Sequence, residues 1–132
     1  MKPTFLHCLL VVVPIICLSA CRESIDDKAV REARQYTAKN CPVEIAPGFV
    51  SDSLVFDKSS RTLNYHFSIK NDAGKVLLDS VQARANVLSS VVNATNLRIY
   101  KEAGFNFRYT YRSASPPHAL LLDLVFTPED YE

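Results

Sequence analysis

The 132-residue sequence has little of what catalytic and metal-binding sites are usually built from. It contains three glycines and three histidines, and it has no HxH, HExxH or CxxC pattern. A loop that cradles phosphate needs several glycines, and a metal site needs clustered His, Cys, Asp or Glu side chains. The sequence therefore predicts no phosphate-binding loop, no metal site and no cofactor, and we expect the protein not to be an enzyme.

Cysteine is also scarce beyond the N-terminal region. Three of the four cysteines, Cys8, Cys17 and Cys21, lie in the first 21 residues, which leaves Cys41 alone in the remainder. That remainder cannot form an intramolecular disulfide, so its fold must depend on a hydrophobic core. We expect Cys41 to be a buried small hydrophobic residue. A nucleophile paired with His66 is the alternative, but nothing in the sequence orients the two side chains.

The chain lacks an excess of charge of either sign. Its formal net charge is +1, with 15 basic and 14 acidic side chains, and the basic count falls to 14 when Lys2 is removed with the first 20 residues. Binding of nucleic acid needs a concentrated basic face. We therefore expect no nucleic-acid partner, and any partner should be recognised through shape and apolar contact.

The N-terminus has the three parts of a secretory signal. Lys2 provides a positive start, residues 5–18 form an almost unbroken apolar run, and two small residues precede Cys21. The apolar run is shorter than the roughly 20 residues that a helix needs to cross a bilayer core. The pattern thus favours a cleaved signal over a permanent membrane span.

The end of this segment, Leu18-Ser19-Ala20-Cys21, resembles the lipobox of bacterial lipoproteins. The resemblance implies that the Cys21 thiol receives a diacylglycerol and that a peptidase cuts immediately before this residue. We therefore expect a signal peptide over 1–20, a lipidated tether over 21–26 and a single domain over 27–132. The resemblance also implies a location at the cell envelope, with the lipid in a membrane, which we expect to be the outer membrane, and the domain facing the periplasm or the surface.

Apolar residues at helical spacing predict three helical segments. In residues 26–39, Ala29, Ala33 and Tyr36 recur at steps of three or four, and acidic residues at the start suit the helix dipole. Further helices are expected over 75–93 and 97–103, the last ending at Gly104.

Alternation of apolar and polar residues predicts strands over 51–57, 62–69, 105–112 and 120–126, with a short extended piece before the Pro47-Gly48 turn. The fold class is therefore α+β, in the order helix–strand–strand–helix–strand–strand. We expect a four-stranded antiparallel sheet with helices on one face. The aromatic residues at alternate positions of the third strand, Phe105, Phe107, Tyr109 and Tyr111, should be buried.

The polar faces of the two clearest strands form a candidate binding surface. Asn64 and His66 lie on one strand, and Arg108 and Arg112 lie on the other. If these central strands are neighbours, the four side chains share an uncovered sheet face on which a partner can bind.

Beyond the lipobox, the chain resembles short lipoproteins of Gram-negative envelopes, with Asn40-Cys41-Pro42 before a hairpin and Gly104 before an aromatic strand. This resemblance implies a function in the envelope. We expect a non-catalytic interaction module that assists another envelope component and contacts the membrane through lipid on Cys21. The alternative is a ligand-binding or inhibitor lipoprotein with a pocket between helix and sheet.

Overall fold

A computed structural model describes residues 22–132, and for residues 76–78 it describes the backbone only. The predicted signal peptide and the predicted lipid attachment site at Cys21 lie outside the described residues. Within 22–132, no helix is both long enough and apolar enough to cross a membrane.

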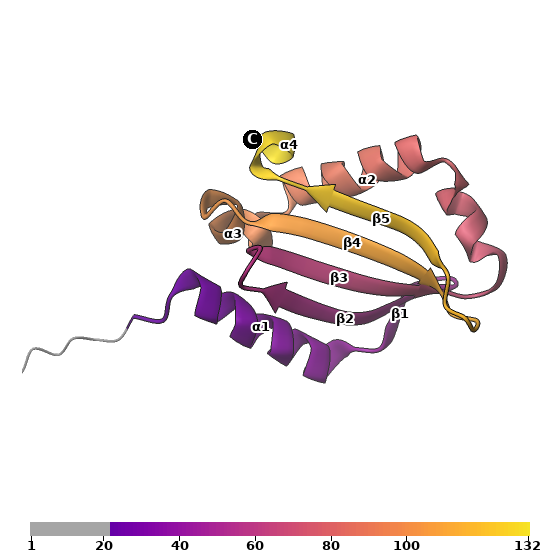
Figure 1. The fold of residues 1–132 in the computed structure, drawn as a ribbon, viewed down its shortest axis with the longest axis horizontal. Coiled ribbons are helices and arrows are strands. Elements are labelled where there is room, and N and C mark those ends of the chain that lie inside the picture. The colour runs from indigo at the N-terminus through magenta and orange to yellow at the C-terminus, as the bar shows by residue number, and fades with distance from the viewer. Residues whose placement is uncertain (1–21) are drawn as a thin grey trace, which may run out of the picture.

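Five strands form one mixed sheet in the spatial order of the chain (Figure 1). They are β1 (Val43–Ala46), β2 (Phe49–Asp57), β3 (Thr62–Ile69), β4 (Asn106–Ser113) and β5 (Leu120–Phe126). The β3–β4 pair is parallel, and the other three pairs are antiparallel.

The helical elements are α1 (Ile25–Asn40), η1 (Asn71–Leu78), α2 (Ser80–Asn93), η2 (Thr95–Leu97), α3 (Arg98–Glu102) and α4 (Pro128–Tyr131). Side chains cap the two longest helices. Ser24 accepts a hydrogen bond from the Asp27 amide at the start of α1, and Asp79 accepts one from the Gln82 amide at the start of α2, both at 3.0 Å. Gly104 follows α3 with a φ of +76°, as expected of a residue that ends a helix in the left-handed conformation.

The α+β class predicted from the sequence is confirmed, but the four-stranded antiparallel sheet was wrong in two respects. The short piece before Pro47 joins the sheet as β1, and β4 pairs with β3 in parallel register, with Leu63 opposite Phe107. The helical segment between β3 and β4 carries the chain back along the sheet, so both strands start at the same end. A connection of this kind produces a parallel pair, whereas a tight hairpin produces an antiparallel one.

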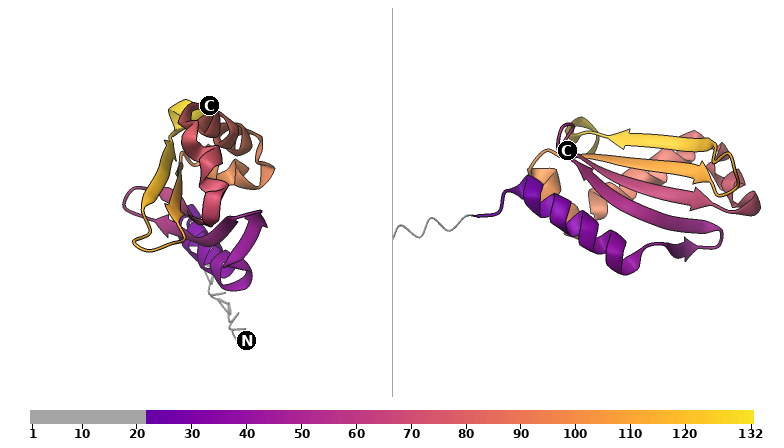
Figure 2. Two further views of the ribbon diagram at one scale, coloured as in Figure 1. Left: turned by 90° about the vertical axis from the view of Figure 1, so that its right-hand side faces the viewer. Right: turned by 60° about the horizontal axis from the view of Figure 1, so that its bottom comes forward.

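The core lies between the sheet and the helices, which pack on one face of it (Figure 2). Ala29 and Ala33 of α1 and Val91 of α2 share one cluster with Phe107 of β4 and Phe126 of β5. The predicted aromatic face of 105–111 is indeed on the inside: Phe105 and Phe107 are fully buried, Tyr111 is buried and Tyr109 is half-buried.

A second, smaller cluster lies toward the end of the sheet where β3 finishes. Phe67, Ile69 and Tyr111 form it, and Phe49 packs against them. Cys41 lies close to this end, between α1 and β1, with its Sγ 3.8 Å from the Ser51 Oγ. Its expected burial was wrong: the chain leaves the core as α1 ends, and the thiol is only half-buried.

Candidate functional site

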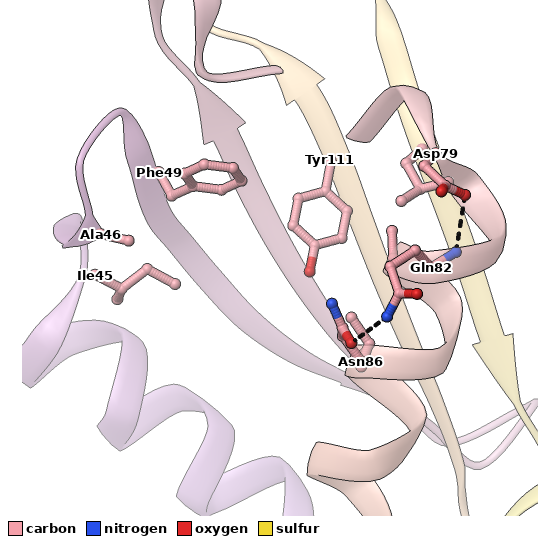
Figure 3. Close-up of a pocket in the computed structure, with 10 residues that line it drawn as sticks. Ile45, Ala46, Phe49, Asp79, Gln82, Asn86 and Tyr111 are labelled. Carbon is pink, nitrogen blue, oxygen red and sulfur yellow. Dashed lines mark hydrogen bonds between the residues drawn. The ribbon is translucent and has the colours of Figure 1, made fainter. Parts of the chain in front are cut away.

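An open apolar groove of about 300 Å³ lies beside the smaller core cluster. One wall is the β1–β2 hairpin, with Ile45, Ala46 and Phe49, and the other wall is the first half of α2. Tyr111 of β4 lies between them, as Figure 3 shows, with its hydroxyl pointing toward Asn86. The groove therefore joins three segments that are far apart in the sequence.

Polar groups on the α2 wall are already paired with each other. The Gln82 side-chain amide donates a hydrogen bond to Asn86 Oδ1 at 2.9 Å, and Asp79 accepts from the Gln82 backbone at 3.0 Å (Figure 3). These bonds fix the side chains along one rim, while the opposite rim offers only aliphatic and aromatic surface. The arrangement suits an apolar occupant with a polar flank.

The hairpin wall is held in place by contacts around Gly48. The Gly48 amide donates to Glu44 Oε1 at 2.8 Å, and the Gly48 carbonyl accepts from the Lys70 amide at 2.8 Å. Because the turn is tied to the segment that follows β3, Ile45 is presented at a fixed position with 56% of its surface exposed. Ile45 and the apolar lining of the groove together form a continuous apolar surface, which is a feature of binding sites.

The residues of the predicted polar surface do come together. The register of β3 and β4 places Asn64 opposite Arg108, and His66 lies one pleat further along on the same face. Arg112, opposite Ser68, extends this row. The condition that the central strands be neighbours is therefore met, although in parallel rather than antiparallel pairing.

Much of the charge on this surface is compensated internally. Arg108 donates two hydrogen bonds to Asp123 of β5, at 2.9 and 2.6 Å, and these hold the pKa of the Asp123 carboxyl below its usual value. Burial, aided by the charges of Arg108 and Arg112, lowers the pKa of His66. The surface therefore carries a neutral histidine and one compensated arginine at neutral pH. A binding role for Asn64, His66, Arg108 and Arg112 stays a prediction.

A second cavity, of about 410 Å³, lies between α1, the sheet and the segment from η2 to α3. Its lining combines three tyrosines, Tyr36, Tyr65 and Tyr100, with the carboxylate of Glu32. The Tyr100 hydroxyl donates a hydrogen bond to Glu32, which also binds Lys28. Among the residues that the structure describes, no group of three or more His, Cys, Asp or Glu side chains could hold a metal ion.

Sequence reasoning did not predict the groove beside Ile45, and it named a pocket between helix and sheet only as the alternative, without its lining residues. It placed Tyr111 in the core and Tyr36 on the buried stripe of a helix, which is where periodicity puts them, but it could not show which elements leave space beside them. The alternation of Val43, Glu44 and Ile45 was the one local sign of a further strand.

Residues 24–122 match the profile of a protein family described as "Domain of unknown function (DUF8479)". A search of curated proteins finds no match to the sequence.

Three solved structures share the fold. A protein of Pseudomonas aeruginosa described as secreted has a TM-score of 0.68 at 13% identity, over 83% of this chain and 98% of its own. The pilotin EpsS of the Vibrio vulnificus type 2 secretion system has a TM-score of 0.65 at 15% identity, over 81% and 91% of the two chains. The type II secretion pilotin AspS of Vibrio cholerae has a TM-score of 0.59 at 18% identity, over 80% and 90%. At these identities the likeness concerns the fold alone.

Proposed function

The chain belongs to the DUF8479 domain family, and we propose that it is a non-catalytic envelope lipoprotein whose domain binds and assists another component of the cell envelope. Lipid on Cys21 anchors it in the outer membrane, and residues 21–26 form the tether between the lipid and the domain. The signal peptide over 1–20 directs its export.

The apolar groove beside Ile45 is the observation that carries this proposal. Its α2 rim is polar, with Asp79, Gln82 and Asn86 linked by two hydrogen bonds, and its hairpin wall is apolar and exposed at Ile45. An apolar segment of an envelope protein would cover Ile45 and fill the hollow. Burial of one such aliphatic side chain stabilises a complex by roughly 1.5–3 kcal/mol.

Two of the structures that share this fold are pilotins of type II secretion systems. We extend the proposal to a pilotin-like role, in which this chain assists a component of a secretion apparatus. In this role the groove binds the component of the secretion apparatus, while the lipid on Cys21 keeps this protein at the membrane.

Two matched substitutions test the groove. Ile45 and Val55 are both exposed β-strand aliphatics, at 56% and 49%, but Val55 does not line the groove. The full-length lipidated protein carrying Ile45→Asp or Val55→Asp is purified from envelope membranes of the native host, and bound proteins are identified by mass spectrometry. A photo-cross-linker at position 45 then identifies the direct contact.

We expect wild type and the Val55→Asp variant to recover the same envelope protein, and the Ile45→Asp variant to recover about tenfold less of it. Equal recovery by both variants would show that the groove is not the binding surface. If no envelope protein is recovered reproducibly, the interaction-module proposal itself fails.

A second function is favoured by the tyrosine-lined cavity beneath α1. This cavity is the pocket between helix and sheet that a ligand-binding lipoprotein requires, and its size falls in the range of about 300–1,000 Å³ that is typical of small-molecule sites.

A further inference from the structure

We infer that the cavity beneath α1 binds an alkylammonium group, of the size and chemistry of choline. This inference deepens the second function above by naming its ligand class. It does not depend on the groove beside Ile45, because the two hollows share no lining residue.

The cavity wall combines aromatic rings with a single anionic side chain. Tyr36 comes from α1, Tyr65 from β3 and Tyr100 from α3, and of the described residues that line the cavity Glu32 is the only charged one. Aromatic faces attract cations through their quadrupole, and clusters of them recognise quaternary ammonium ligands. Among the residues that the structure describes, no lysine or arginine lines the cavity, and the nearby Lys28 is paired with Glu32, so an anion would find no free positive charge there.

The aromatic walls are fixed before any ligand arrives. Tyr65 stacks on Tyr109 with the ring centroids 4.7 Å apart, and Tyr100 stacks on Phe105 with the centroids 5.4 Å apart. The hydrogen bond from the Tyr100 hydroxyl to Glu32 fixes that ring further. A ligand therefore binds without first having to order these side chains, which lowers the cost of binding.

Glu32 stays ionised in this setting. Burial opposes its ionisation, but hydrogen bonds from Lys28 and Tyr100 outweigh that effect and lower the pKa of Glu32. Lys28 and Arg31 are the cations nearest to it, and Arg31 is itself paired with Glu23 at 2.8 Å. A ligand must share the carboxylate with Lys28, so the aromatic and apolar contacts decide its affinity.

The remaining wall favours a methylated ammonium over a compact inorganic cation. Ala29 and Ala33 are buried small residues of α1 that leave room beside the sheet, and Leu54 and Leu63 add apolar surface. Asn96 adds one amide group to the lining, and a compact inorganic cation would gain nothing from the apolar part of the wall. The methyl groups of a quaternary ammonium instead gain contact with this wall.

Isothermal titration calorimetry tests the inference on the full-length protein in a maltoside detergent, whose head group carries no ammonium. Choline is compared with 3,3-dimethylbutan-1-ol, the neutral molecule of nearly the same shape. We expect choline to bind about tenfold more tightly than this isostere, because only choline carries the charge. Phosphocholine forms a third arm: binding as tight as that of choline would identify a lipid head group as the source, and weaker binding would identify a free cation.

Two variants locate the binding. Tyr36→Leu removes a ring at a partly exposed position, and Glu32→Gln removes the charge while keeping an acceptor for Tyr100; each should weaken choline binding several-fold. Glu102→Gln is the control, since Glu102 forms a helix-surface pair with Arg98 and does not line the cavity. The inference is overturned if choline does not bind, if its isostere binds equally well, or if Glu102→Gln matches the other two variants. None of these results would change partner recovery at the groove.

Discussion

Thr37 of α1 exchanges two hydrogen bonds with the backbone of Leu54 in β2. Its hydroxyl donates to the Leu54 carbonyl at 2.9 Å and accepts from the Leu54 amide at 2.9 Å. Because β1 pairs only with residues 49–51 of β2, no strand within residues 22–132 pairs with that edge of β2 beyond them. The Thr37 side chain therefore provides the two backbone hydrogen bonds that Leu54 would make with a further strand. Helix α1 also covers this strand edge, which could otherwise pair with another protein chain.

Thr37→Val should destabilise the fold by about 1–3 kcal/mol, because the isosteric valine leaves the amide and carbonyl of Leu54 without their partner. Thr37→Ser, which retains the hydroxyl, should lose much less. Urea denaturation followed by circular dichroism measures both. A valine variant as stable as the serine variant would mean that water replaces the hydroxyl at no cost.

Gly48→Ala should cost more stability than alanine at either other glycine. The φ of Gly48 is +79°, and an added Cβ would lie 2.5 Å from the Ala73 Cβ, so the substitution combines backbone strain with a clash. Gly104 has a φ of +76°, but its added Cβ would make only an ordinary contact, with the Pro128 Cγ at 4.0 Å, so Gly104→Ala should cost about 1 kcal/mol from the backbone alone. Thermal unfolding of the three variants measures this order.

Gly74→Ala is the matched control, because its added Cβ would make only ordinary contacts, the closest with a leucine methyl at 3.4 Å. If Gly48→Ala unfolds at the same temperature as Gly74→Ala, the hairpin must be free to move away from η1, and the fixed wall of the groove would be in doubt.

Arg108→Gln should raise the pKa of His66. Burial is the largest cause of the lowered pKa of this histidine, and the charge of Arg108 is the next. Removal of that charge also leaves Asp123 uncompensated, which acts in the same direction. Titration of the His66 ring protons by NMR measures the change, with Arg98→Gln on α3 as the control. An unchanged midpoint would mean that burial alone sets the pKa.

The lowered pKa of His66 in the folded protein also makes the free energy of unfolding depend on pH. Between the lowered pKa of folded His66 and the usual value near 6.5, the unfolded chain binds more protons than the folded one. Stability should therefore fall as the pH drops through this window. His66→Gln should reduce that fall, which urea denaturation at several pH values measures.

Cys21→Ala should release the protein from the membrane, because the proposed lipid is the anchor and two or more acyl chains are needed for stable attachment. Fractionation of the native host, followed by detection of the protein in membrane and soluble fractions, measures this. Ser19→Ala keeps small residues before the cysteine and is the control that should stay at the membrane. Retention of the Cys21→Ala protein would contradict the lipoprotein assignment.

Local patterns in the sequence were enough to predict most of the helices and strands. The alternation from Thr62 to Ile69 predicted β3 at its exact bounds, and the spacing of Ala29 and Ala33 predicted α1, since both features depend only on which side chains share a face. The polar row of Asn64, His66, Arg108 and Arg112 was predicted in the same way. These residues are neighbours in the structure because β3 pairs with β4.

The sequence by itself determined which faces of its elements are apolar, where turns fall and, through the pattern ending at Cys21, the expectation of a lipid anchor. Tertiary structure alone decided the parallel pairing of β3 with β4, the entry of β1 into the sheet and the two hollows beside Ile45 and Tyr65. The physical reason is the range of the interactions. Periodicity and turn chemistry act within a few residues, whereas strand order depends on the path of the long connection between β3 and β4, and a cavity depends on where packed elements fail to meet.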